Sequence, residues 1–341
     1  MNRDRVKIGV VGIGRLGRLH AMQLKQVAEA EFIGIYDINP QRAAEVGREF
    51  GIPAFSSFAE LLEAVEAVSI VTPTTHHFEY ARQALSTNRH VFLEKPMAET
   101  LEQADQIIAL GNERGLKIQV GHIERFNPAI MALEPLPINP LFIEAHRLAN
   151  FSPRGADVAV VLDLMIHDID LILSFVKSPV KEVRASGVSI ISPAEDIANC
   201  RLQFENGCVA NVTASRISAR KMRKMRFFQP NAYISVDFLE GFSEIYYIDR
   251  GNFKPGETSL AFSLGQIKEG AEKKEIRYTR LNKAEINPLR YELQLFCQAI
   301  LEDNTPPVTA EEGRRALRIA QIILRNIDEH TQLVKNHWKL G

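Results

Sequence analysis

Short apolar runs alternate with helix-period segments along the first third of the chain. The runs are rich in Val and Ile and are typical of buried strands, while the segments between them repeat apolar residues every three or four positions. This alternation predicts a parallel sheet covered by helices on both faces. Six strands are expected, at residues 6–11, 31–37, 53–55, 67–71, 90–94 and 117–121. Helices are expected between them, at residues 15–30, 40–51, 58–65, 77–88 and 101–115.

The pattern changes after the sixth strand. Four prolines between residues 125 and 140 interrupt the rhythm, which predicts a domain boundary between Gly121 and Asn139. Beyond it an amphipathic helix at residues 160–176 is followed by strands joined by short turns, among them a hairpin at Asn206-Gly207. The strands are expected at residues 141–149, 180–190, 198–205, 208–217, 224–229, 232–238, 243–249 and 275–280, and two closing helices at 287–300 and 309–327.

These patterns predict an α/β protein of two domains. Residues 1–123 are expected to form a doubly wound Rossmann domain, and residues 124–341 an α+β domain with an open, mainly antiparallel sheet. A length of 341 residues and a hydrophobic fraction of 45 % agree with two soluble globular domains.

Charge and cysteine usage narrow the partners. A formal net charge of −1 gives no overall field that would attract nucleic acid or a membrane surface. The start lacks a signal-peptide pattern and no apolar window approaches the roughly 18 residues of a membrane span, so a cytoplasmic location is expected. Cys200, Cys208 and Cys297 are scattered, which argues against a disulfide framework or a zinc site, and no metal is expected.

Three glycines follow the first strand and open the next helix. Gly12, Gly14 and Gly17 have G-x-G-x-x-G spacing: the first permits the tight turn, the second leaves room for a pyrophosphate, and the third lets helix and strand approach. Asp37 ends the second strand, 20 residues after Gly17, where a carboxylate accepts hydrogen bonds from ribose hydroxyls and repels a 2′-phosphate. NAD is therefore expected over NADP, although Arg42 could partly offset this preference.

Two further strands end at the same edge of the expected sheet. Thr72, Pro73 and Thr74 end one, and Glu94 and Lys95 end the next, so both groups are expected near the nicotinamide end of the cofactor. A lone histidine at the start of the following helix, His77, is more typical of a structural or capping role than of an acid or base. The residues expected to bind the cofactor are Gly12, Ile13, Gly14, Arg15, Leu16, Asp37, Thr72, Pro73, Thr74, His77, Glu94 and Lys95.

Four features occur together in a fixed order. They are the Gly12 to Gly17 fingerprint, Thr72-Pro73 followed by His77, the triplet Glu94-Lys95-Pro96, and Asp163 four residues before His167. With the segments INPLRYELQLF and PPVTAEEGRRALRIA near the C-terminal end, they make the chain resemble the Gfo/Idh/MocA family of sugar oxidoreductases over nearly its whole length. The resemblance implies a second domain whose open sheet mediates homodimers or homotetramers, and a nicotinamide that lies where the two domains meet.

Two shorter segments carry a narrower resemblance. GHIERFNPA at residues 121–129 and SPRGADVAVVLDLMIHDID at residues 152–170 resemble the subgroup of that family that acts as UDP-N-acetylglucosamine 3-dehydrogenases.

The expected helix at residues 160–176 presents an acid–histidine pattern. Asp163, His167 and Asp170 are spaced four and three apart, which puts them on one face of an α-helix. A histidine between two acids is suited to proton transfer near neutral pH. The alternative is a carboxylate at a helix N-terminus beside a histidine that is only structural; the cofactor motifs favour catalysis.

Hydride transfer from a secondary alcohol needs a group that takes the hydroxyl proton. We expect His167 to accept that proton, Asp163 to orient His167 or bind a sugar hydroxyl, and Lys95 to donate a hydrogen bond to the reacting oxygen. The roles of Lys95 and His167 could be exchanged, because desolvation and the charge of oxidised nicotinamide would lower the pKa of a lysine.

Arginines are the candidates for binding an anionic substrate. Arg125 and Arg154 could bind a nucleotide-sugar diphosphate, although surface or hinge ion pairs are an equal alternative for each. A basic run could bind an anionic substrate or a partner subunit, but a solvated, aggregation-blocking strand face is the more common role. It contains Arg216, Arg220, Lys221, Arg223, Lys224 and Arg226.

Taken with the resemblance, these residues predict an NAD-dependent oxidation of a sugar or nucleotide sugar, most specifically at the 3-hydroxyl of UDP-N-acetylglucosamine. Another sugar or inositol-type dehydrogenase is the alternative among enzymes, and a non-catalytic regulator that binds dinucleotide is the alternative outside them.

Overall fold

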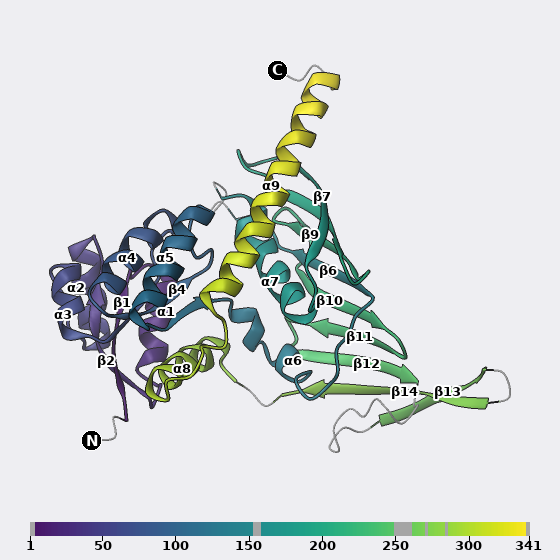
Figure 1. Cartoon of the computed structure of the whole chain (residues 1–341), viewed down its shortest axis with the longest axis horizontal. Coiled ribbons are helices and arrows are strands. Elements are labelled where there is room, and N and C mark those ends of the chain that lie inside the picture. The colour runs from purple at the N-terminus through teal and green to yellow at the C-terminus, as the bar shows by residue number, and fades with distance from the viewer. Residues whose placement is uncertain (1–3, 153–157, 249–260, 270–271, 284–285, 339–341) are drawn as a thin grey trace. The chain divides into compact units, whose positions relative to one another are not determined.

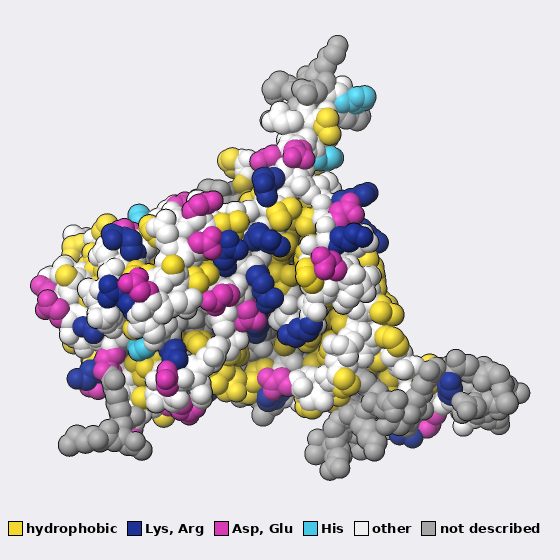
Figure 2. Space-filling model, in the orientation of Figure 1, with side chains coloured by type: hydrophobic (Ala, Val, Ile, Leu, Met, Phe, Trp, Pro, Cys, Tyr) yellow, Lys and Arg dark blue, Asp and Glu magenta, His cyan; other side chains and the backbone are white. Residues whose placement is uncertain are grey.

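The chain forms two compact units in a computed structural model that describes residues 4–152, 158–248, 261–269, 272–283 and 286–338 (Figure 1). The first unit comprises residues 1–123 and 287–317, and the second comprises residues 124–286 and 318–341. On the face shown in Figure 2, acidic and basic side chains are intermixed and neither sign dominates, in line with the net charge of −1.

A parallel sheet with the order β2-β1-β3-β4-β5 forms the centre of the first unit. Its strands are β1 (Val6–Val11), β2 (Ala30–Tyr36), β3 (Ala67–Ile70), β4 (His90–Glu94) and β5 (Ile118–Gly121). The prediction of a strand at residues 53–55 is wrong: the segment forms only one parallel bridge, between Ile35 and Ala54. Pro53 has no N–H, and only its carbonyl joins the ladder, accepting from Ile35 N at 3.0 Å.

The helices of the first unit follow the predicted segments. They are α1 (Arg15–Leu24), α2 (Pro40–Phe50), α3 (Phe58–Ala64), the 3₁₀ turn η1 (Thr74–His76), α4 (His77–Ser86), α5 (Leu101–Arg114) and α8 (Pro288–Leu301). Helix α5 begins with a capping box of Thr100 and Gln103, and its C-cap residue Gly115 adopts the left-handed conformation.

Helix α8 returns to the first unit, so the division differs from the expected contiguous split after residue 123. Its apolar face, with Leu293 and Phe296, is fully buried in one cluster with β1, α1 and Phe92 of β4. Helix α8 packs here because, together with α1, it covers the apolar side chains on one face of the sheet.

A nine-stranded sheet forms the second unit, with the order β13-β14-β12-β11-β10-β6-β9-β8-β7. All neighbouring pairs are antiparallel except β6 and β9, as the mainly antiparallel prediction requires. The strands are β6 (Phe142–Leu148), β7 (Val180–Val188), β8 (Ile197–Phe204), β9 (Val209–Ser215), β10 (Met222–Gln229), β11 (Ala232–Asp237), β12 (Phe242–Ile248), β13 (Ala261–Glu269) and β14 (Glu272–Asn282). Gly207, at φ 87°, turns the predicted hairpin between β8 and β9.

Strand β13 is absent from the sequence prediction. It carries no in–out alternation of burial, because the side chains of Ala261 to Gln266 are all exposed, and Gly265 shifts its register against β14.

Helices pack against the large sheet at several strands. Helix α7 (Ile166–Phe175) contacts β6 and β9, and Phe175 packs edge-on against Phe227 at 4.9 Å. The remaining elements are the 3₁₀ turn η2 (Ile123–Phe126), α6 (Pro128–Met131), the π-helical turn η3 (Val161–Met165) and α9 (Ala310–Trp338). On α9, Asn326 donates to the carbonyl of Val183 on β7 at 2.7 Å.

Candidate active site

The glycine loop after β1 has the geometry that a dinucleotide requires. Gly12 adopts φ 85°, and a Cβ on it would lie 2.8 to 2.9 Å from Thr72 and Val71. A Cβ on Gly17 would lie against the carbonyl oxygen of Gly12, so only glycine allows α1 to start this close to the loop. A Cβ on Gly14, in contrast, would meet no atom within 4 Å, which leaves open space at the start of α1. This pattern matches the three roles that the spacing predicts.

Asp37 fastens the glycine loop to the end of β2. Its Oδ2 accepts from the backbone N–H of Ile13 at 2.7 Å, and its Oδ1 accepts from the N–H of Asn39 at 2.8 Å. A guanidinium nitrogen of Arg42 lies 3.6 Å from the same carboxylate. A carboxylate has about four acceptor sites, so these contacts leave capacity for ribose hydroxyls. The residues of this edge therefore fit NAD.

The segment after β3 holds the expected residues Thr72, Pro73 and Thr74, and the 3₁₀ turn η1 begins at Thr74. The Thr72 Oγ1 is buried and has no hydrogen-bond partner among the described residues, as expected of a group that awaits a ligand.

His77 is structural in its contacts, as the sequence analysis favours. It is fully buried, with Nδ1 2.9 Å from the carbonyl oxygen of Pro96 and Nε2 2.9 Å from that of Thr72. Burial lowers the pKa of His77, although the two carbonyl groups act in the opposite direction. The ring thus joins the segment after β3 to the segment after β4.

The Glu94-Lys95-Pro96 triplet ends β4, and the Lys95–Pro96 peptide bond is cis. Lys95 is half-buried. Glu94 was expected beside the cofactor, but its carboxylate is turned inward: Oε2 accepts from the Lys95 N–H at 3.2 Å, and Oε1 lies 3.1 Å from Nε2 of His20. The available signal for His20 was its place three residues after Gly17, on the side of α1 that faces the sheet.

In the second unit, the helix expected at residues 160–176 begins as the π-helical turn η3 and continues as α7. Asp163 lies in η3 and His167 at the start of α7, and both are partly buried. In a π-helical turn the backbone hydrogen bonds join residues five apart instead of four. The α-helical spacing used in the sequence analysis therefore does not predict whether Asp163 and His167 lie on the same face. Such turns are frequent at functional sites.

Asp170, expected on one face with His167, is buried in an ion pair. It is 1 % exposed, and its two oxygens accept from Nε and one terminal nitrogen of Arg125 at 2.7 and 2.6 Å. Arg125, expected to bind substrate, therefore holds α7 by a bidentate pair. The other arginine expected in the site, Arg154, lies outside the described residues.

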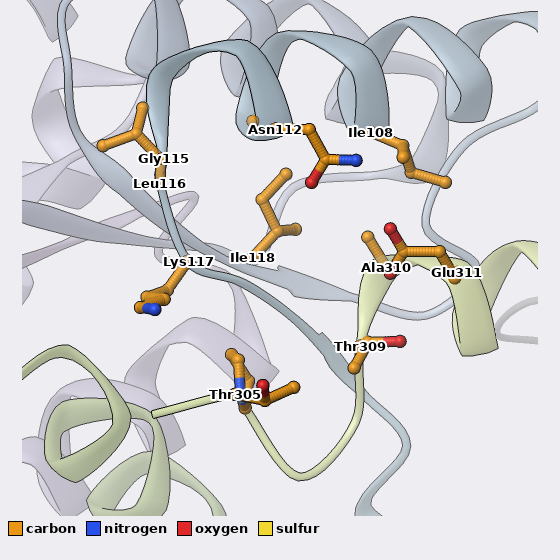
Figure 3. A pocket seen from close by; sticks show the side chains of 12 residues that line it. Ile108, Asn112, Gly115, Leu116, Lys117, Ile118, Thr305, Thr309, Ala310 and Glu311 are labelled. Atoms are coloured by element: carbon orange, nitrogen blue, oxygen red, sulfur yellow. The ribbon is translucent and has the colours of Figure 1, made fainter. Parts of the chain in front are cut away.

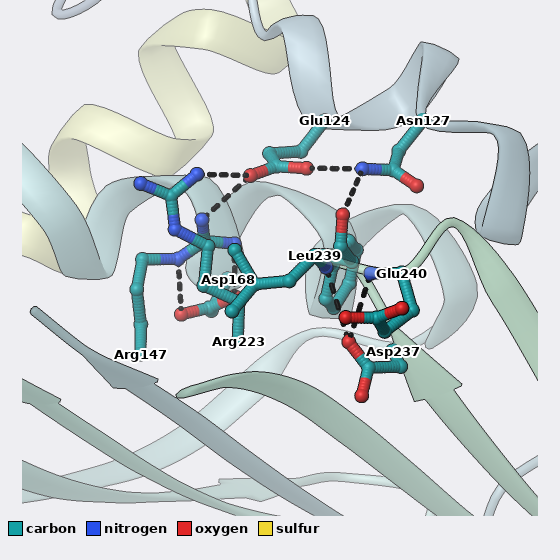
Figure 4. A network of polar contacts seen from close by, with 9 residues as sticks. Glu124, Asn127, Arg147, Asp168, Arg223, Asp237, Leu239 and Glu240 are labelled. Atoms are coloured by element: carbon teal, nitrogen blue, oxygen red, sulfur yellow. Dashed lines mark hydrogen bonds and ion pairs between the residues drawn. The ribbon is translucent and has the colours of Figure 1, made fainter. Parts of the chain in front are cut away.

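A second bidentate pair holds α7 through Asp168, the residue that follows His167 in the sequence (Figure 4). Arg147 of β6 donates to both oxygens of Asp168 at 2.9 and 2.7 Å and to Glu124 at 2.6 Å, and all three side chains are buried. Burial alone would lower the pKa of Arg147, but the two carboxylates raise it, so the guanidinium stays charged. Asn127 extends the network from Glu124 to the carbonyl of Phe238, as Figure 4 shows. Sequence reasoning missed Arg147, Asp168 and Glu124, because buried ion pairs resemble solvated charges in a sequence.

The basic run at residues 216–226 is divided among acidic partners. Lys224 pairs with Asp237 at 3.0 Å and Arg226 with Glu144 at 3.0 Å, while Arg223 lies 3.9 Å from Glu124. Arg216 is buried and donates to the carbonyl of Val158.

Elsewhere in the first unit, a hollow lies beside the end of α5 and the start of α9 (Figure 3). Asn112, Lys117, Thr305 and Glu311 are among its lining residues. None of the residues expected to bind cofactor or substrate lines it.

Within the described parts of the chain, no three metal-binding side chains are grouped as a candidate ligand set, and no helix is long and apolar enough to cross a membrane.

Comparison with known proteins adds the family. Residues 6–122 match the profile of the Gfo/Idh/MocA oxidoreductase family with its NAD-binding Rossmann fold, and residues 144–234 match the profile of its C-terminal domain.

Among individual proteins, the chain is 42 % identical over 264 residues to the UDP-N-acetylglucosamine 3-dehydrogenase of Acidithiobacillus ferrooxidans, covering 76 % of this chain and 84 % of that protein. A solved structure of that enzyme superposes with a TM-score of 0.85 at 36 % identity, covering 95 % and 98 % of the two chains.

Two further relatives are 30 % identical over shorter stretches. They are the glucose-6-phosphate 3-dehydrogenase of Bacillus subtilis, with 62 % of this chain and 68 % of that protein covered, and the inositol 2-dehydrogenase of Rubrobacter xylanophilus, with 54 % and 56 % covered. Together with the glycine loop, the Asp37 anchor and the two sheets, these matches show that the chain belongs to the Gfo/Idh/MocA family of NAD-binding oxidoreductases.

Proposed function

We propose that this protein oxidises the 3-hydroxyl of UDP-N-acetylglucosamine to a ketone with NAD. The observation that carries the proposal is the extent of similarity to the A. ferrooxidans enzyme, which spans 95 % of this chain and therefore both units. A likeness limited to the cofactor domain would support only the choice of cofactor.

In the proposed reaction Lys95 and His167 act on the same substrate hydroxyl. Bound NAD supplies a hydride acceptor for the hydrogen on C3, and the electron pair of the O–H bond forms the C=O bond. His167 takes the hydroxyl proton, Lys95 donates a hydrogen bond to the oxygen, and Asp163 orients His167 or binds a sugar hydroxyl. The two arginine–aspartate pairs around His167 support this assignment, because they fix the helix on which the histidine lies.

We propose Arg125 and Arg154 as ligands of the diphosphate of the UDP-sugar, and each residue requires its own test. Arg125 already binds Asp170, so its replacement would also loosen α7. An Arg154→Ala variant should raise KM for the UDP-sugar with little change in kcat, since a guanidinium on a diphosphate contributes binding to substrate and transition state alike.

Oxidation of a phosphosugar or an inositol is the second candidate, since the two relatives at 30 % identity carry those names. The two candidates differ in the need for the nucleotide: a phosphosugar or inositol dehydrogenase would turn over without a UDP moiety.

We also propose that the enzyme is a homodimer or homotetramer that associates through the large sheet. The face opposite α7 carries a ladder of aromatic rings across five strands, with ring centroids 5.0 to 5.7 Å apart. Its members are Phe142, Phe228, Tyr233, Tyr246 and Tyr278. Phe228 and Tyr246 are about one-third exposed, at 37 % and 36 %, and partly exposed aromatic rows are favourable in interfaces.

Three free, buried cysteines support a reducing location, for which we propose the cytoplasm.

NADH formation tests the proposal when the protein is mixed with NAD and, separately, UDP-N-acetylglucosamine, N-acetylglucosamine, glucose 6-phosphate and myo-inositol. Turnover of the UDP-sugar alone supports it, and preferential turnover of a substrate without UDP would replace it by the second candidate. Lys95→Met and His167→Asn should each abolish most turnover; near wild-type rates in both variants would refute the assigned roles.

A further inference from the structure

The side chains of His20, Ser69 and Glu94, from three different elements, contact one another next to Lys95. His20 of α1 is fully buried, with Nε2 3.1 Å from Oε1 of Glu94 and Nδ1 2.9 Å from Oγ of Ser69 on β3. Ser69 is fully buried as well, and Glu94 is 8 % exposed. A carboxylate only accepts, so the proton on Nε2 is donated to Glu94 and fixes the orientation of the ring.

The space around the Glu94 carboxylate is closely fitted. A Cβ on Gly121 of the neighbouring strand would lie 2.9 Å from Oε1, so glycine at this position makes room for the carboxylate. The ring of Phe92 packs edge-on against His20 at 5.6 Å. The second carboxylate oxygen accepts from the backbone N–H of Lys95 at 3.2 Å. The carboxylate thus connects a buried histidine directly to the backbone of the proposed catalytic lysine.

The charge of Glu94 is maintained by its surroundings. Burial would raise the pKa of Glu94, but the hydrogen bond and charge of His20, with the nearby charges of Lys95 and His77, lower it below its usual value. The titratable groups that face the carboxylate are His20 from α1, Lys95 on its own segment and His77 from α4. Glu94 is therefore ionised at neutral pH and supplies a negative charge close to Lys95.

We propose that His20 is a positioning residue for the dehydrogenase reaction: through Glu94 it fixes the backbone and the electrostatic surroundings of Lys95. Ser69 supports it by holding the other ring nitrogen. The proposal rests on the role assigned to Lys95 above and adds to it a chain of contacts that runs from α1 and β3 to the site.

Two substitutions separate positioning from simple packing. His20→Leu removes the donor and leaves the buried carboxylate without its main partner, whereas His20→Gln keeps an N–H that can reach Glu94. We expect kcat to fall about 10- to 100-fold in His20→Leu and less than about threefold in His20→Gln, since small displacements of a reacting group cost that much. The Kd for NAD, measured by titration, should change less than kcat in both, because His20 is not among the residues expected to bind the cofactor.

The pH profile supplies the readout that loss of packing would not change. Without His20 the pKa of Glu94 should rise, so the acidic limb of the kcat/KM profile should move to higher pH in His20→Leu and much less in His20→Gln. Gln119→Leu is the matched control: it removes another fully buried bond of the same unit, from Gln119 to the carbonyl of Glu292 at 3.1 Å. Equal loss of kcat in His20→Leu and this control, with superimposable pH profiles, would overturn the proposal.

A measurement without turnover keeps this test independent of the reaction. Carbon-13 NMR of glutamate-labelled protein, with Glu94→Gln to assign the signal, follows the carboxyl as pH falls. The carboxyl should titrate at higher pH in His20→Leu than in the wild type. If no sugar is oxidised but this difference appears, the proposed reaction is wrong while the chain of contacts is correct; if the titrations coincide, the positioning role is wrong.

Discussion

The carboxylate of Asp37 accepts a hydrogen bond of 2.7 Å from the backbone N–H of Ile13, which joins the end of β2 to the glycine loop after β1. The residue expected to bind the ribose therefore also shapes the loop expected to bind the pyrophosphate. Asp37→Ala should weaken NAD binding by about 1.5 to 3 kcal/mol, the usual range for hydrogen bonds to a charged group, and NADP binding by less. Calorimetric titration with both dinucleotides checks this, and equal losses for the two would contradict a ribose role for Asp37.

Substitution by alanine should affect NAD binding at Gly14 and thermal stability at Gly17. A Cβ on Gly14 meets no atom within 4 Å, whereas a Cβ on Gly17 collides with the carbonyl oxygen of Gly12. Gly14→Ala should leave the melting temperature unchanged but weaken NAD binding at least about tenfold, because the methyl group occupies space expected for the pyrophosphate. Gly17→Ala should lower the melting temperature. Wild-type affinity for NAD in Gly14→Ala would show that the open space is not the pyrophosphate site.

The buried pair of Arg147 and Asp168 predicts a large stability effect. Arg147→Met leaves Asp168 and Glu124 as buried charges without their cation and should cost about 3 to 5 kcal/mol in the free energy of unfolding. Arg223→Met removes only a half-exposed arginine 3.9 Å from Glu124 and should cost less than about 1 kcal/mol. Urea titrations of the two variants provide the comparison. Similar costs in both would mean that the network in Figure 4 contributes no more than surface charges do.

His77 predicts a pH dependence of stability. Its pKa in the folded state lies below the usual 6.5, so the unfolded chain binds this proton first as the pH falls. The contribution is therefore complete above pH 6.5 and is lost as the pH falls from there through the folded-state pKa. The free energy of unfolding should fall as the pH is lowered through 6.5, and His77→Gln should reduce that fall. An identical fall in the variant would remove His77 as its source.

Local patterns predicted most of the fold because each reports on its own segment. The period of two or 3.6 residues located the strands and helices, and the glycine spacing located the dinucleotide loop. Strand β13 was missed because its exposed side chains leave no pattern of burial in the sequence. The packing of α8 against the first unit was missed because an apolar residue such as Phe296 gives no indication of which hydrophobic core it belongs to.

The site was predicted less completely, for a similar reason. His20 and Glu94 are 74 positions apart and Arg147 and Asp168 are 21 apart, and a charged residue looks the same in a sequence whether it is solvated or buried against a partner. The spacing gave no sign that the carboxylate of Asp170 binds Arg125 or that the turn before α7, which holds Asp163, is π-helical.

The central claim is that C3 of UDP-N-acetylglucosamine is the carbon oxidised. The most direct test uses UDP-N-acetylglucosamine deuterated at C3, mixed with the protein and NAD, with mass spectrometry of the dinucleotide product. We predict that the NADH formed carries the deuterium and that the sugar product has lost it. NADH without deuterium, or a product that retains the label at C3, would contradict the claim.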